Sequence, residues 1–234
     1  MKQKRILVFL FTMIMLFLSG CGSYQLRGPS DKDPKPGALA FCMYYREKRF
    51  IGEQNTWVYD INIVENVGNN RFANIPRMNR DDKVKEVLDV NGYCLIHTGL
   101  KPGVLYSIDR AKASYVEGRT QYTINIELEP ETSAQKIAMY VEPGKIKFFG
   151  VIMLEAIVTE KGSLFVADKK AIQVVDGNEH LKDFLLGYIA TYVYGKYEKS
   201  NKGAEANLLN SLLTTHKEGY WHDIAANRLK ELGL

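Results

Sequence analysis

The chain has 234 residues, of which 46% are hydrophobic and 25% charged, and its formal net charge at pH 7 is +4. The first 20 residues contain three basic residues and no acidic one, so 28 basic and 27 acidic residues remain after them, a net charge of +1. A balance this close to neutral offers no broad basic footprint for nucleic acid, and we expect no nucleic-acid partner.

The N-terminus has the layout of a secretory signal peptide. Lys2, Lys4 and Arg5 make a basic start, and residues 6–18 follow as an uncharged run that only Thr12 interrupts. This run is shorter than the roughly 20 helical residues that cross a hydrocarbon core of about 30 Å. A removable export signal is therefore a better interpretation than a permanent transmembrane helix.

The apolar run ends in Leu18-Ser19-Gly20-Cys21. This tetrapeptide resembles the signal of bacterial lipoproteins, in which the cysteine thiol is acylated, the chain is cut before the cysteine, and the new amine is usually acylated too. The resemblance implies that residues 1–20 are removed and that lipidation of Cys21 anchors the mature chain, since acyl chains contribute about 0.8 kcal/mol per buried CH2. The alternative is an ordinary signal peptide with a cysteine there by chance.

Gly22 follows the cysteine, whereas the family's signal for retention in the inner membrane of many Gram-negative bacteria is Asp. The resemblance thus implies the outer membrane, with the periplasmic and the surface-exposed side both open. Residues 22–37 are polar and hold three prolines, with few apolar side chains to bury. They predict a lipidated tether over residues 21–37.

From residue 38 to about residue 175 the sequence has the period of two that is typical of strands with one buried and one wet face. The clearest runs of alternating apolar residues are Trp57, Tyr59, Ile61 and Ile63, and Tyr122, Ile124, Ile126 and Leu128. Strands are predicted near residues 38–45, 56–64, 93–97, 104–108, 120–128, 137–141, 145–158, 163–167 and 171–175. The segment 145–158 is apolar on both faces, so it should be central or covered on both sides, and Gly150 in its middle predicts a bend or a close neighbour.

Three Pro-Gly pairs precede predicted strands, at positions 36–37, 102–103 and 143–144. Proline presets the second position of a type II turn and glycine supplies the positive φ of the third, so the pairs predict chain reversals. Residues 81–89 (DDKVKEVLD) predict a short helix inserted between strands.

Residues 38–175 are therefore predicted to form an antiparallel β-sandwich or flattened barrel, which makes the protein mainly β (α+β overall). The turn at residues 142–145 (EPGK), followed by Phe148 and Phe149, resembles the hairpin of transthyretin-like β-sandwich domains of bacterial lipoproteins. That resemblance implies the same sandwich.

After residue 176 the apolar period changes to that of helices. Gly195, Gly203 and Gly219 separate three such segments, so we expect residues 176–234 to form two or three helices. Residues 204–232 are similar to one helix pair of the tetratricopeptide-like kind. Because a stacked array needs about three repeats, we expect this pair to pack on the sheet or cap it.

Cys42 and Cys94 are the other cysteines, and both lie in apolar, strand-like sequence. An oxidising compartment permits a disulfide between them, but two such cysteines can equally be small core residues. Spacing alone does not decide between these alternatives.

The sequence contains no recognisable signature of a reaction. His97, His180, His216 and His222 share no metal-ligand spacing, no serine-nucleophile motif is present, and no Gly-rich phosphate loop follows a strand. We therefore expect no metal, no cofactor and no nucleotide, and we name no catalytic residue. The 14 tyrosines, with pairs such as Tyr44-Tyr45, could line a carbohydrate or peptide groove, although core or rim positions are the better expectation.

Two classes of function follow. The first is a non-enzymatic lipoprotein of the bacterial envelope that acts through contacts with an envelope or extracellular protein. The alternatives are a periplasmic hydrolase of glycan, lipid or peptide whose site is assembled only in three dimensions, or a carrier of lipid or another small ligand. A pocket with two carboxylates or a Ser/His/Asp set would favour the hydrolase, and a large apolar cavity would favour the carrier.

Overall fold

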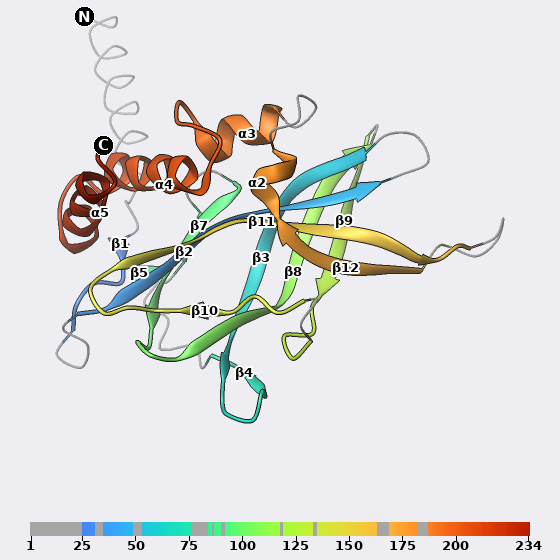
Figure 1. Cartoon of the computed structure of the whole chain (residues 1–234), viewed down its shortest axis with the longest axis horizontal. Helices are drawn as coiled ribbons and strands as arrows, with labels where there is room; N and C mark the ends of the chain where they lie inside the picture. Colours follow the sequence, from blue (N-terminus) through green and yellow to red (C-terminus); the bar gives the residue numbers. More distant parts are fainter. Residues whose placement is uncertain are drawn as a thin grey trace, which may run out of the picture.

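A computed structural model describes residues 25–30, 35–48, 53–75, 84–85, 87–89, 92–117, 119–132, 135–162, 169–181 and 187–234. In these residues a curled mixed β-sheet forms the body, and the helices gather at the C-terminal end of the chain (Figure 1). The predicted fold class, mainly β with a helical C-terminal segment, is confirmed.

The main sheet runs in the order β10-β8-β3-β2-β11-β12. These strands are β2 (Gly37–Lys48), β3 (Glu53–Asn66), β8 (Leu105–Glu117), β10 (Met139–Tyr140), β11 (Ile146–Glu160) and β12 (Lys169–Asp176). Off this path lie β4 (Phe72–Asn74) on β3, β9 (Thr120–Glu127) on β8, β7 (Cys94–Leu100) on β2, and β6 (Val87–Asp89) on β7. Among the described strands of this sheet, every pair is antiparallel except β2 with β11, which is parallel and makes the sheet mixed.

Strand β2 is buried on both faces, and only Lys48 at its end is exposed. On one face, Leu39, Phe41, Met43 and Tyr45 point into the curled sheet, where they join the inner core with residues from β8 and β11. Its other face carries Ala38, Ala40, Cys42 and Tyr44, and these pack in a second, outer core with the helices. The small residues at 38 and 40 allow that close approach.

In the described residues four helices follow β12: α2 (Gly177–His180), α3 (Gly187–Tyr194), α4 (Asn201–Thr215) and α5 (Tyr220–Glu231). The fully buried Leu208, Leu209 and Leu212 of α4 lie in the outer core with side chains of β2 and β11. The pair α4–α5 thus packs on the sheet, as expected. No helix in the described part of the chain is both long and apolar enough to span a membrane.

A bulge at Gly150 divides β11 into two halves. Gly150 has a φ of 107°, and the pairing of β11 with β2 shifts between Phe148 and Val151. The shift reverses the alternation, so Ile146 and Val151 both face the helices although strict period two would separate them. The prediction of a strand covered on both faces, with a bend at Gly150, is confirmed.

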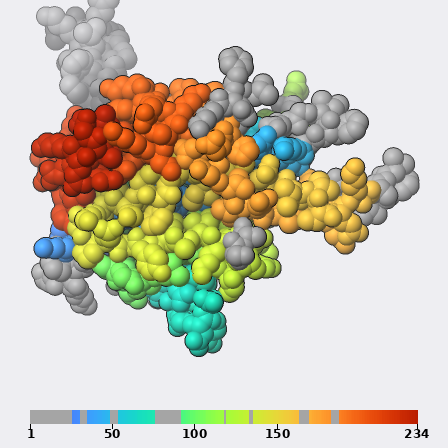
Figure 2. Space-filling model, in the orientation of Figure 1, coloured from blue at the N-terminus to red at the C-terminus, as the bar shows by residue number. Residues whose placement is uncertain are grey.

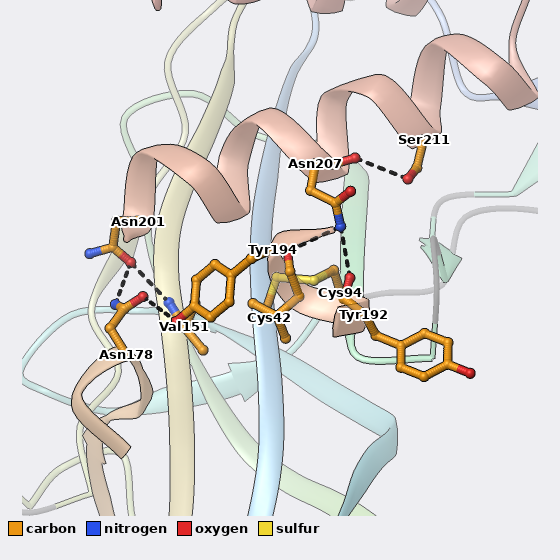
Figure 3. The surroundings of a disulfide bond; sticks show 10 residues. Cys42, Cys94, Val151, Asn178, Tyr192, Tyr194, Asn201, Asn207 and Ser211 are labelled. Carbon is orange, nitrogen blue, oxygen red and sulfur yellow. Dashed lines mark hydrogen bonds between the residues drawn. A yellow bond between two sulfur atoms is a disulfide. The ribbon is translucent and has the colours of Figure 1, made fainter. Parts of the chain in front are cut away.

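The bulge also receives the start of α4 (Figure 3). The backbone N–H of Val151 donates to Oδ1 of Asn201 over 3.2 Å, and Nδ2 of Asn178 donates to the same oxygen over 2.7 Å. The hydroxyl of Tyr194 in turn donates to Oδ1 of Asn178 over 2.8 Å. A Cβ on Gly150 would lie 2.9 Å from Oδ1 of Asn201, so this network needs a glycine there.

Some sequence-based expectations are wrong. Residues 84–85 form a strand, β5 (Val84–Lys85), and residues 87–89 form β6, so the short helix predicted over residues 81–89 is not formed. The predicted strand at residues 163–167 lies outside the described residues. Gly103 and Gly144 have the positive φ expected after proline, but Gly37 does not, and Gly203 lies inside α4 and does not separate two helices.

The Gly150 bulge leads to a prediction with a matched control. Gly150→Ala should lower the free energy of unfolding by about 1–3 kcal/mol for the backbone conformation alone, and further because the new Cβ displaces Asn201. The control is Gly103→Ala. Gly103 has a φ of 77°, and a Cβ there would have no heavy atom within 4 Å, so only the backbone cost applies. Urea denaturation measures both variants, and equal losses would contradict the role given to Asn201.

Candidate functional site

Strand β2 changes its neighbour halfway along one edge, and this creates a fork in the sheet. Residues 37–42 pair with β7, whereas residues 44–48 pair with β3. Met43 lies between the two pairings, and its N–H donates to the carbonyl oxygen of Tyr93 over 2.7 Å. Strands β7 and β3 therefore occupy consecutive parts of the same edge of β2, and the change from one to the other falls at Met43.

The structure places a disulfide between Cys42 and Cys94 at the fork (Figure 3). These two residues form the last register pair between β2 and β7, and both side chains are buried. Of the two alternatives that the sequence left open, the structure shows the paired one. The bond joins residues 52 positions apart and fixes the end of β7 against β2.

A cavity of about 260 Å³ lies between the two branches of the fork. Strand β3 and the segment that enters β7 line it, with Val58, Tyr59, Asp60, Ile61, Ile63, Gly92, Tyr93, Cys94, Leu95 and His97. Asp60 has a φ of 50°, and the register of β3 with β8 shifts between Tyr59 and Asn62. The carboxylate of Asp60 lies 2.6 Å from Nζ of Lys112, and this pairing raises the pKa of the lysine.

The irregularity at Asp60 also reverses the side-chain alternation of β3. The sequence predicts that Trp57 is buried, and this is wrong: its side chain is 43% exposed, whereas Val58 beside it is buried. After the irregularity Ile63 is buried as expected. Trp57 and Tyr59 therefore lie on the outer side of β3, with ring centroids 6.0 Å apart.

Further aromatic rings continue from this pair, and we call the set Trp57, Tyr59, Tyr93, Tyr188 and Tyr192 the aromatic patch. The ring of Tyr93 lies 5.6 Å from that of Tyr192, which lies 5.0 Å from that of Tyr188. A Cβ on Gly92 would lie 3.3 Å from the Trp57 ring, so the tryptophan packs against the backbone next to Tyr93. Tyr59 and Tyr93 line the cavity, which connects the two halves of the patch.

Exposure differs sharply within the aromatic patch. Tyr188 is 67% exposed and Tyr192 is 40% exposed. Tyr93 is partly buried, and burial, followed by the nearby Tyr188 and Tyr192, raises its pKa to about 12. The patch therefore has a partly buried phenol at its centre and exposed rings around it.

The other candidate residues are not brought together. His180 is hydrogen-bonded to Arg46 and His222 to Asp223, and His97 contacts the carbonyl oxygen of Thr98. In the described residues no group of three His, Cys, Asp or Glu side chains could hold a metal ion. Tyr44 and Tyr45 are fully buried on opposite faces of β2 and line no groove, and Cys21 lies outside the described residues.

The aromatic patch was not predicted as a site from the sequence. The sequence pattern predicts a buried face for Trp57 and Tyr59, because they continue the alternation of Ile61 and Ile63. The one local signal was Asp60, a charged residue in the middle of that strand, which is uncommon in strands unless the chain is irregular there.

The fold and the site define a curled mixed sheet, forked at its central strand and covered by C-terminal helices, with aromatic side chains around the fork. Comparisons of the chain with protein-family models, with curated proteins and with solved structures found no match.

The disulfide at the fork should contribute strongly to stability. In the chain-entropy model, closing a loop of this length stabilises a protein by about 4 kcal/mol. The double variant Cys42→Ala/Cys94→Ala should lose about that amount in chemical denaturation. A reductant should lower the stability of the original protein to a similar level and leave the double variant unchanged. A reductant effect of equal size on both proteins would show that the bond does not fix the fork.

Proposed function

We propose that the protein is a lipoprotein of the bacterial envelope, anchored through Cys21 and acting as a non-enzymatic binding module for an envelope or extracellular protein. The tetrapeptide that ends at Cys21 supports the anchor, and Gly22 supports the outer membrane as its location. The aromatic patch at the fork supports the binding role. No nucleic acid, nucleotide or cofactor is part of the proposal.

The observation that carries the binding role is the exposure of large aromatic rings in one place. Tryptophan and tyrosine are the residues most enriched among those that dominate binding energy in protein interfaces, and they cluster near the interface centre. In this protein the rings of Trp57, Tyr188 and Tyr192 are each at least 40% exposed. They are positioned by β3 and α3, which pair with or pack on the rest of the fold. Such a preformed surface limits the conformational entropy that binding costs.

The cavity favours a small-ligand carrier as a second candidate. Its volume of about 260 Å³ is just below the range of about 300–1,000 Å³ for ligand pockets, and its lining is largely apolar. The hydrolase hypothesis has no observation that favours it. The described lining contains one carboxylate, that of Asp60, which is paired with Lys112, whereas a glycoside hydrolase needs two acids on either side of one bond.

The anchor is tested by metabolic labelling with palmitate in a bacterial host. The protein should incorporate the label, and Cys21→Ala should remove it because no other thiol is free once Cys42 and Cys94 are joined. The variant should also remain in the uncleaved form. Labelling that persists in Cys21→Ala, or that is absent from the original protein, would contradict the proposed anchor.

The aromatic patch is tested by photo-crosslinking in intact cells of the native host. A photoreactive residue at position 188 should give a discrete protein adduct, and the same residue at position 140 should not, although Tyr140 is 53% exposed. Trp57→Ala should weaken the adduct by about 30-fold, which corresponds to a contribution of about 2 kcal/mol.

Tyr140→Ala is the matched control, and it should leave the adduct at position 188 unchanged. Thermal unfolding establishes that each variant is folded. Equal effects of Trp57→Ala and Tyr140→Ala would contradict a binding role for the patch. A patch adduct with a small molecule in place of a protein would favour the carrier.

A further inference from the structure

The chain that follows the proposed lipid site is bound to the body of the protein. Residues Gln25–Leu26 form β1, which pairs in parallel with β5. The side chain of Leu26 is 6% exposed and belongs to the outer core. The part of the predicted tether (residues 21–37) that forms β1 is therefore packed against the fold.

Helix α5 fixes this segment at two points. Nε1 of Trp221 donates to the carbonyl oxygen of Arg27 over 2.7 Å, and the hydroxyl of Tyr220 donates to the carbonyl oxygen of Pro36 over 2.9 Å. Trp221 is itself buried in the outer core. The backbone on both sides of residues 31–34 is thus joined to the first turn of α5.

This attachment leaves a very short connection to the lipid. Three residues lie between Cys21 and Gln25, and a fully extended chain spans at most about 3.6 Å per residue step, so the four steps of the connection reach about 14 Å. A folded chain of this length has a radius of gyration of about 17 Å. Because the connection is shorter than that radius, a body anchored at Cys21 cannot turn freely above the membrane.

The end of the molecule next to this connection carries charges of both signs. A groove of about 380 Å³ runs between α5 and the start of β11, lined by Glu142, Lys145, Lys147, Arg228 and Glu231 among others. Glu142 is paired with both lysines, which lowers its pKa to about 2. Moving such charged side chains into hydrocarbon is costly, whereas the headgroup region accommodates them. This end fits the surface of a bilayer and not its interior.

We propose that the α5 end, defined as β1, α5 and residues 142–147, rests on the headgroup surface of the membrane that holds Cys21. The inference depends on the proposed lipidation. In this orientation the β11–β12 hairpin points away from the membrane, since it projects at the opposite end of the long axis of the molecule from α5 (Figures 1 and 2).

The orientation is tested with the lipidated full chain in phosphatidylethanolamine/phosphatidylglycerol vesicles that contain a headgroup-linked quencher lipid. A fluorophore is attached at Lys230→Cys in α5 or at Lys169→Cys in β12, both exposed positions. The thiol at either position is the free one, because Cys21 is acylated and Cys42 is joined to Cys94. Quenching at position 230 should exceed that at position 169 by several-fold.

Lengthening the connection supplies the second test. Twenty Gly/Ser residues inserted after Gly22 add a flexible segment of about 25 Å, which should reduce quenching at position 230 towards the value at position 169. Trp221→Phe, which keeps a ring in the core but removes the donor to Arg27, should reduce it partly. Equal quenching at both positions before the insertion, or no change after it, overturns the inference.

The failure of lipidation is distinguishable from the failure of the orientation. A protein that carries no palmitate and does not float with vesicles contradicts both the anchor and the inference. A protein that floats with vesicles but shows equal quenching at positions 230 and 169 contradicts the orientation alone.

Discussion

The rest of the structure depends on β2, a strand buried on both faces that has three neighbouring strands. One edge pairs in parallel with β11, and the other is shared between β7 and β3. A residue can pair with one strand on each edge, so two strands that share an edge must separate where one replaces the other. The fork, its cavity and the aromatic patch follow from that replacement at Met43. The disulfide between Cys42 and Cys94 lies at the point where the separation begins.

The two faces of β2 divide the molecule into layers. Leu39, Phe41 and Met43 fill the interior of the curled sheet, while Ala38 and Ala40 leave room for the helices on the other side. Burying one large apolar side chain contributes about 1.5–3 kcal/mol, so each layer gains from the same short segment of chain. The helices complete the fold because the outer face of β2 and β11 is apolar and requires a cover.

The period of the sequence predicted most of the strands and the helical C-terminal segment, because period two and period 3.6 report burial directly. It failed where the backbone departs from that period. Gly150 and Asp60 each reverse the alternation, so the faces of β11 and β3 could not be assigned from residue parity. Residues 84–85 and 87–89 are too short for periodicity to separate strand from helix, and their pairing with β1 and β7 decides. The disulfide and the patch depend on the register between strands far apart in sequence, which local patterns do not contain.

The contact between α5 and the N-terminal segment connects the proposed anchor to the proposed binding surface. Trp221 binds the chain next to β1, and it shares the outer core with Cys42 and Cys94 at the fork. No flexible joint is needed between these parts, since the same core contains side chains of α5, α4 and β2. Under the proposed lipidation, the membrane therefore fixes the height and direction of the aromatic patch. A surface presented in this way loses less rotational freedom on binding, and its affinity for a partner in the same envelope gains accordingly.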